Sequence, residues 1–179
     1  MLGEELNFLG KFMKVLLMRH VMADSVEESK VEYDAMRPIS EQGRRHCESV
    51  AKFIKGANMT PKAAICSPFR RAVETIEAMN EIVPCTYSPS SLIAPGCGVD
   101  DLLQALTNNC DECDDDWQLA VLHEPDVGYI LGELVLAGIE FPFDVLPGNV
   151  YALDIDIVDQ QVSGNIISYF SPVRVARLK

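Results

Sequence analysis

The chain has 179 residues, of which 48% are hydrophobic and 23% charged, a balance typical of a globular protein with one sizeable core. Its formal net charge of −12 argues against nucleic-acid binding, because that affinity comes largely from lysines and arginines that displace counterions from phosphates. No apolar stretch approaches the roughly 20 residues of a membrane span. The six cysteines are scattered along the chain, so we expect reduced thiols and a cytoplasmic protein.

The first half of the chain predicts two strands, each followed by a helix. Residues 13–18 form an apolar run broken only by Lys14, which is typical of a central strand buried on both faces. Residues 21–38 are polar and acidic and predict a loop. Ser40 is then a suitable N-cap for a helix that Gly56 ends. A second short strand is predicted over 63–66. The helix after it has one face formed at helical spacing by Ala72, Thr75, Ile76, Met79 and Val83.

The second half continues the alternation of strands and helices. Its predicted elements are, in chain order, strand 85–87, helix 99–106, acidic loop 108–116, strand 118–122, a helix that stops at Gly138, and segments 150–157 and 166–170. We expect the last two segments to pair as a hairpin or edge pair joined through Ser163 and Gly164. The sheet is therefore expected to be mixed rather than wholly parallel.

Three fragments with charged or imidazole side chains lie at strand-to-helix junctions. Arg19 and His20 end the first strand, residues 67–72 (SPFRRA) follow the second, and His123 follows the strand over 118–122. Because ligands of open α/β sheets gather at the carboxyl ends of the strands, we expect these fragments to converge. A histidine beside fixed guanidinium groups can attack phosphorus while the arginines neutralise the phosphoryl oxygens. Together the fragments indicate a phosphoryl site.

In this order and context the fragments resemble the motifs of the histidine phosphatase (phosphoglycerate mutase-like) superfamily. The matching segments are the opening Arg-His motif at 17–20, the Arg-Pro-Leu-Thr-x-x-Gly turn at 37–43, the Ser-Pro-x-x-Arg-Ala-x-x-Thr element at 67–75, and the His-x-Pro-x-Val-Gly of the SixA-like phosphohistidine phosphatases at 123–128. The resemblance begins near Phe12, so we expect an N-terminal extension over 1–11 and one domain over 12–179. It implies a three-layer α/β/α sandwich with a mostly parallel, mixed central sheet.

The resemblance also implies roles for four side chains. His20 would attack phosphorus and carry the phosphoryl group, while Arg19, Arg71 and His123 would hold its oxygens. Water would then hydrolyse the phosphohistidine, and no metal or cofactor is needed.

The sequence leaves three points around this site open. The family spacing assigns the phosphate contact to Arg71, and the adjacent Arg70 would be solvated or contact the substrate. Arg37 is equally compatible with a phosphate or substrate contact and with a structural ion pair. Val21 replaces the glycine that usually follows the Arg-His pair, which leaves the shape of the pocket open.

The substrate class depends on whether a general acid is present. Departing alkoxides need a proton, yet no glutamate is clearly placed to supply it, and Asp24, Glu74 and Asp126 are better explained as solvated or capping carboxylates. Phosphohistidine has a labile P–N bond and an imidazole leaving group that solvent can protonate. We therefore favour a phosphatase for a phosphohistidine-bearing protein. The alternatives are a phosphatase of small phosphate esters and, if Val21 narrows the pocket, a non-catalytic phosphoprotein-binding module.

Two remaining features receive weaker interpretations. His46 has no motif around it and is expected at the surface. Cys110 and Cys113 have the spacing of half a zinc site with Cys97 and a histidine, but no second such pair exists, so we expect no metal. The expected partners are a phosphohistidine-bearing protein and a phosphate-like oxyanion, with no nucleic acid or membrane. The sequence does not indicate the oligomeric state.

Overall fold

A computed structural model of the chain describes residues 11–109, 116–139 and 144–176. It contains one six-stranded sheet of order β3-β2-β4-β1-β5-β6. The strands are β1 (Lys11–Arg19), β2 (Ala63–Cys66), β3 (Thr86–Pro89), β4 (Trp117–Leu122), β5 (Val150–Val158) and β6 (Gln161–Phe170). The first four strands of this order pair in parallel, whereas β5 and β6 are antiparallel to their neighbours. The prediction of a mixed, mostly parallel sheet with the first strand inside it is confirmed.

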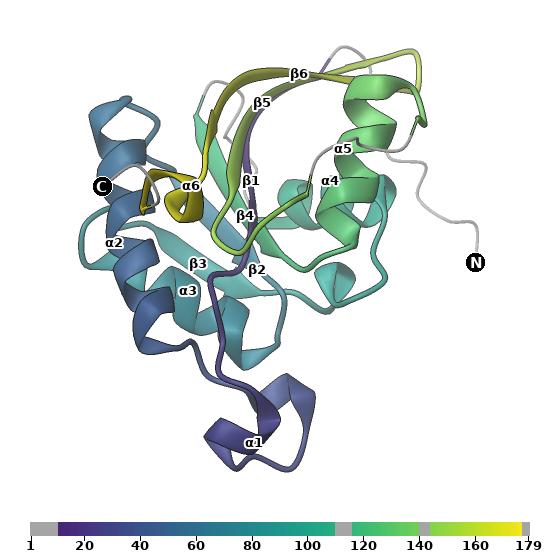
Figure 1. Cartoon of the computed structure of the whole chain (residues 1–179). Helices are drawn as coiled ribbons and strands as arrows, with labels where there is room; N and C mark the ends of the chain where they lie inside the picture. The colour runs from purple at the N-terminus through teal and green to yellow at the C-terminus, as the bar shows by residue number, and fades with distance from the viewer. Residues whose placement is uncertain (1–10, 110–115, 140–143, 177–179) are drawn as a thin grey trace.

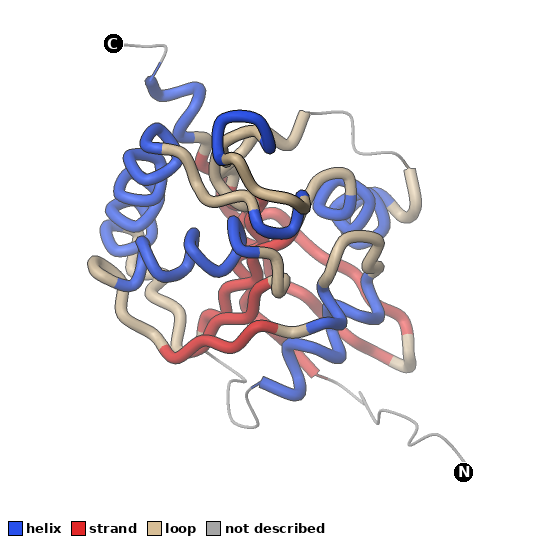
Figure 2. Tube along the Cα trace, turned by 90° about the horizontal axis from the view of Figure 1, so that it is seen from below, coloured by secondary structure: helices blue, strands red, loops and turns tan. Residues whose placement is uncertain are grey.

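Helices cover both faces of this sheet (Figures 1 and 2). One layer contains α2 (Glu41–Gly56), α3 (Arg70–Asn80) and α6 (Pro172–Ala176), and the other contains α4 (Val99–Asn109) and α5 (Asp126–Leu136). Successive residues of a strand point to opposite faces, so Leu16 joins the core beneath α2 and α3 while Val15 and Leu17 join the core beneath α4 and α5. The three-layer α/β/α sandwich is confirmed.

The helix that follows the Arg-Pro turn begins as predicted. Ser40 caps α2, because its hydroxyl accepts a hydrogen bond from the Gly43 amide at 3.1 Å. The glycine of this turn, Gly43, is needed for close packing, because a Cβ there would lie 2.2 Å from the carbonyl oxygen of Met22. The first turn of α2 therefore packs directly on the backbone two residues beyond His20.

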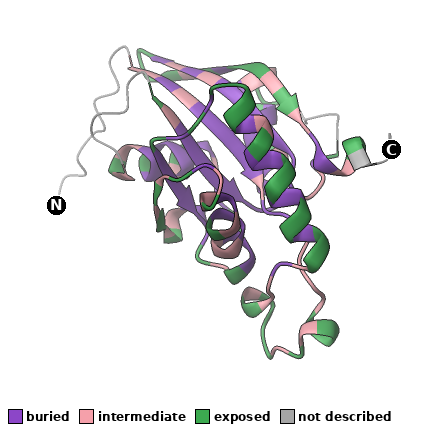
Figure 3. Cartoon of the chain, turned by 90° about the vertical axis from the view of Figure 1, so that its left-hand side faces the viewer, coloured by how far each residue is buried: buried purple, intermediate pink, exposed green. Residues whose placement is uncertain are grey.

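The segment over 21–38 is more ordered than the expected loop. It contains the short helix α1 (Val26–Ser29) and the 3-10 helix η1 (Asp34–Met36). Ser25 and Glu28 form a capping box at the N-terminus of α1. In Figure 3 this segment projects from the sandwich, and most of its residues are intermediate or exposed. A second 3-10 helix, η2 (Ser91–Ile93), lies between β3 and α4.

The position of the last turn was predicted wrongly. Asp159 and Gln160 join β5 to β6, whereas Ser163 and Gly164 lie inside β6. Both turn residues have positive φ, of 50° and 65°, which matches the twist of a two-residue hairpin. Gly164 serves packing instead, because a Cβ there would lie 3.2 Å from Cβ of Leu134 on α5.

The described part of the chain begins with β1. Residues 1–10 of the expected extension lie outside the described residues, and Lys11 is the first residue of β1. Within the three described ranges, no helix combines the length and apolar character needed to cross a membrane.

Candidate active site

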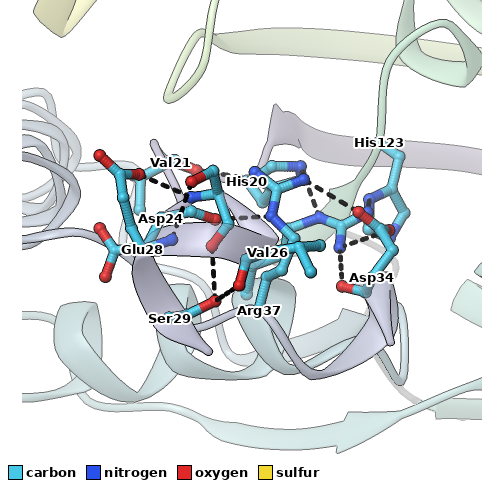
Figure 4. A network of polar contacts seen from close by, with 11 residues as sticks. His20, Val21, Asp24, Val26, Glu28, Ser29, Asp34, Arg37 and His123 are labelled. Carbon is cyan, nitrogen blue, oxygen red and sulfur yellow. Dashed lines mark hydrogen bonds and ion pairs between the residues drawn. The ribbon is translucent and has the colours of Figure 1, made fainter. Parts of the chain in front are cut away.

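The carboxyl ends of β1, β2 and β4 meet at one edge of the sheet, as parallel pairing requires. They bring together the side chains that the sequence predicted to converge. A cavity of about 320 Å³ opens at this edge, and its lining includes Arg19, His20, Arg37, Arg71, His123 and Glu124. Figure 4 shows His20, His123, Asp34 and Arg37 in one network of polar contacts beside it.

The hydrogen bonds of His20 determine which ring nitrogen is unprotonated. Nδ1 lies 2.7 Å from the carbonyl oxygen of Val21, and because a carbonyl only accepts, Nδ1 carries the hydrogen. Nε2 is then the unprotonated nitrogen, and it accepts a hydrogen bond from Nε of Arg71 at 3.0 Å. Burial is the main reason that the pKa of His20 falls to about 3, and His123 and the arginines lower it further. The ring is therefore neutral and nucleophilic at neutral pH.

Arg71 is the hub of the site. Its NH2 group lies 3.2 Å from Nδ1 of His123, and its NH1 group donates to the Asp34 carbonyl at 2.9 Å and lies 3.0 Å from Asp34 Oδ2. The guanidinium also lies 4.9 Å from the centre of the Phe69 ring. With only 7% of the residue exposed, these contacts fix its orientation on the first turn of α3.

His123 presents a buried donor. Because arginine cannot accept a hydrogen bond, Nδ1 of His123 accepts from Arg71 and Nε2 carries the hydrogen. This Nε2 has no hydrogen-bond partner within the described part of the chain. Burial first, and then Arg71, lower the pKa of His123 to about 4, so this ring is also neutral. An oxyanion in the cavity would give the buried N–H a partner.

Arg19 ends β1 and lines the cavity. Its NH1 group donates to the carbonyl of Val145 at 2.6 Å, while its buried Nε has no partner among the described residues. Burial lowers its pKa, which Glu124 opposes, but an arginine remains charged at neutral pH. Arg19 and Arg71 thus place two cations beside two neutral imidazoles.

The structure separates the two adjacent arginines. Arg71 lines the cavity, whereas Arg70 is half-exposed outside it and bonds through Nε to Oε1 of Glu74 at 2.7 Å. For Arg37 the structure shows the ion pair, and a phosphate or substrate contact stays a prediction. Arg37 lines the cavity, and it also pairs through NH1 with Oδ1 of Asp34 at 2.9 Å.

Val21 does not shape the cavity wall. Its side chain is fully buried in the core beneath α2 and α3. Its amide donates to Oγ1 of Thr75 at 3.3 Å, and Thr75 donates in turn to the carbonyl of Arg71 at 2.6 Å. Thr75 therefore ties the backbone beside His20 to the helix that carries Arg71.

The carboxylates in the site differ from those considered in the sequence. Asp24, Glu74 and Asp126 are not among the residues that line the cavity. Glu74 accepts from the Ile39 amide at 2.8 Å, and Asp126 accepts from the Gly96 amide at 3.0 Å. Sequence reasoning missed the contact of Asp34, for which no motif gave a signal. It also assigned no role to the Glu124 side chain, although Glu124 directly follows His123.

The prediction for His46 is wrong, and that for the cysteine pair is not tested. His46 is not a surface residue, because only 5% of it is exposed, on the face of α2 that also buries Cys47 and Val50. Cys110 and Cys113 lie outside the described residues, which leaves the zinc half-site untested. The described ranges contain no group of three side chains placed to hold a metal ion.

A neutral imidazole beside the buried guanidinium of Arg71 suits phosphoryl chemistry, and comparison with known proteins identifies the family. Residues 15–90 match the model of the histidine phosphatase superfamily (branch 1). The chain is 33% identical over 131 residues to phosphohistidine phosphatase SixA of Escherichia coli K12, which covers 68% of this chain and 74% of that protein. The chain therefore belongs to the histidine phosphatase superfamily.

Solved structures agree with this assignment. The protein histidine phosphatase SixA complexed with tungstate matches with a TM-score of 0.72 and 26% identity, over 91% of this chain and 99% of that one. A proposed phosphohistidine phosphatase SixA from Nakamurella multipartitia matches with a TM-score of 0.73 and 20% identity, over 90% and 97%, which bears on the fold alone. The fold is the phosphoglycerate mutase-like fold.

Proposed function

We propose that this protein is a phosphohistidine phosphatase that acts on a phosphotransfer domain or carrier protein. The observation that carries the proposal is the unprotonated Nε2 of His20, held 3.0 Å from Nε of Arg71 in a cavity shared with Arg19 and His123. The similarity of the chain to SixA supports phosphohistidine as the substrate class.

In the proposed reaction Nε2 of His20 attacks phosphorus in line. The P–N bond of the substrate breaks, and its electron pair stays on the departing imidazole nitrogen. The Nε–H that Arg71 donates to Nε2 in the resting protein is released to a phosphoryl oxygen, while the guanidinium keeps its orientation. Arg19 and the Nε2–H of His123 bind the other phosphoryl oxygens. Water then attacks phosphorus, and the electron pair of the second P–N bond returns to Nε2 of His20.

The Nδ1–H of His20 has a defined part in both steps. While Nε2 carries the phosphoryl group, the ring is a cation whose remaining N–H donates to the Val21 carbonyl. When the P–N bond breaks, the ring becomes neutral without any proton transfer. His20 can therefore accept and release the phosphoryl group without a separate acid.

Trapping the intermediate tests this function. Acid-labile, base-stable phosphate should accumulate on His20 when the protein reacts with a labelled phosphohistidine protein and is quenched in alkali, and the His20→Asn variant should form none. Turnover should be compared on the phosphohistidine protein, p-nitrophenyl phosphate and a sugar phosphate. Undiminished turnover by His20→Asn would overturn the proposed nucleophile.

Glu124 supports one alternative function. A carboxyl in the cavity could protonate an alkoxide, so the structure removes the argument that no acid is near the reacting groups. A small phosphate ester then becomes the second candidate substrate, and efficient sugar-phosphate hydrolysis that Glu124→Gln abolishes would favour it. The argument for a non-catalytic binding module was that Val21 narrows the pocket. That argument no longer holds, because Val21 lies in the core and does not line the cavity.

A further inference from the structure

Glu124 brings a carboxylate to a cavity otherwise suited to anions. It is the only acidic residue among the described residues that line the cavity. The amide of Gly128 in the first turn of α5 lies close to this carboxylate and opposes the rise of its pKa. Its Oε1 atom lies 3.2 Å from the place where a Cβ of Gly128 would stand. The absence of a side chain on Gly128 thus lets the carboxylate rest against α5.

This placement opposes phosphoryl binding unless the substrate offers something in return. A carboxylate beside Arg19 offsets part of the positive charge that attracts the phosphoryl oxygens, and it repels those oxygens directly. Burial raises the pKa of Glu124, and the positive charge of Arg19 opposes part of that rise. The carboxylate therefore suits a substrate that carries an N–H donor or a positive charge next to its phosphoryl group.

Phosphohistidine carries such a group. One ring nitrogen holds the phosphoryl group, and the other, when protonated, makes the ring a cation with one N–H donor. We propose that Glu124 accepts a hydrogen bond from this second ring nitrogen of the substrate and so selects phosphohistidine over phosphate esters. The inference rests on the proposed function and assigns the recognition of the leaving group to a residue of this chain.

The contact also assists the first chemical step. With the second nitrogen protonated, cleavage of the P–N bond leaves its electron pair on the first nitrogen, and neutral imidazole departs. Glu124 stabilises that protonated form and transfers no proton. The carbonyl of Val21 has the same relationship to His20, at 2.7 Å from its Nδ1, so one hydrogen-bond arrangement serves the substrate ring and the enzyme ring.

An ester leaving group has a different requirement. Its bridging oxygen has no N–H donor, so the carboxylate offers an aryl phosphate only repulsion. Replacing Glu124 with glutamine removes the charge and keeps the shape. The rate on phosphohistidine should therefore fall, whereas the rate on p-nitrophenyl phosphate should stay constant or rise.

The test compares two substrates and three proteins. Wild type, Glu124→Gln and the control Glu133→Gln are assayed on a histidine-phosphorylated phosphotransfer domain and on p-nitrophenyl phosphate. Glu133 lies on α5, is exposed and is not among the residues that line the cavity, so its variant should behave as wild type. In Glu124→Gln, kcat/KM for the phosphohistidine protein should fall about tenfold to a hundredfold, as expected for a lost charged hydrogen bond. The aryl phosphate value should not fall.

Each outcome bears on one hypothesis. An unchanged ratio between the two substrates, or an equal loss on both, would overturn the role of Glu124 while leaving phosphohistidine hydrolysis in place. A wild-type protein that fails to hydrolyse the phosphohistidine domain but turns over p-nitrophenyl phosphate would overturn the proposed function itself, and this inference with it.

Discussion

Nε of Arg71 lies 3.0 Å from Nε2 of His20, and the NH2 group of the same guanidinium lies 3.2 Å from Nδ1 of His123. The planar guanidinium of Arg71 therefore donates to both imidazoles, so each ring carries its hydrogen on the nitrogen that faces away from Arg71. Nε2 of His20 has no hydrogen and accepts from Arg71, whereas His123 keeps its hydrogen on Nε2. This relationship makes the shape of the arginine as important as its charge.

The Arg71→Lys variant should lose most of its activity although its charge is kept. An ammonium group cannot donate in fixed directions to both imidazoles and then to two phosphoryl oxygens, so kcat should fall about a hundredfold or more. Single-turnover rates on the phosphohistidine domain give the comparison. Arg70→Lys is the matched control, because Arg70 pairs with Glu74 outside the cavity, and a larger loss in that variant would reverse the assignment.

Asp34 should weaken the binding of oxyanions to the resting protein. Its Oδ2 lies 3.0 Å from NH1 of Arg71, so an incoming anion competes with a carboxylate for the same guanidinium. Asp34→Asn removes this charge and keeps an oxygen acceptor, and its affinity for tungstate should rise several-fold in calorimetry. Glu32→Gln removes a charge from the same segment and should not change the affinity. Equal or weaker binding by Asp34→Asn would show that the carboxylate serves to hold Arg71 in place.

The convergence of the site could be predicted because it follows from topology. Arg19 ends one strand of the parallel part of the sheet. His20, Ser67 and His123 each follow such a strand, and parallel strands end at the same edge. Asp34 could not be predicted in this way. It reaches Arg71 through a segment without apolar periodicity, so only the tertiary contact fixes its place.

A glycine caused the wrong prediction of the last turn. The sequence suggested a turn at Gly164, but this glycine makes room for α5, and the turn is formed by Asp159 and Gln160 with positive φ. A pattern of residue types cannot distinguish a glycine that bends the chain from one that lets two elements approach closely. The helix boundaries were predicted more closely because caps such as Ser40 act locally.

Gly43→Ala should destabilise the protein and impair the site together. The new Cβ would lie 2.2 Å from the carbonyl oxygen of Met22, a residue of the cavity wall, so either α2 or this backbone must shift. We expect the free energy of unfolding to fall by at least ~2 kcal/mol in urea titrations. Gly56→Ala, in the last position of the same helix, meets no atom within 4 Å and should be neutral or stabilising by up to about 1 kcal/mol. Equal effects of the two variants would contradict this packing argument.

The buried imidazoles should make the folded protein sensitive to acid. The pKa of His20 is lowered to about 3, mainly by burial, while an unfolded histidine titrates near its model value of 6.5. Between these pH values the unfolded chain binds a proton that the folded chain excludes, so this contribution is fully present above pH 6.5 and is lost as the pH falls toward 3. Its slope is about 1.4 kcal/mol per pH unit.

Replacing His20 with asparagine should remove that slope. Unfolding free energies measured from pH 6.5 to 4.5 in phosphate-free buffer should fall less steeply in His20→Asn than in wild type, by about 2–3 kcal/mol over the interval. The comparison concerns slopes, so a constant difference in stability between the two proteins does not affect it. His123→Asn should give a similar change that ends at higher pH, because the pKa of His123 is about 4. Parallel pH profiles for wild type and His20→Asn would show that the pKa of His20 is not lowered in the folded protein, which would contradict the effect of burial.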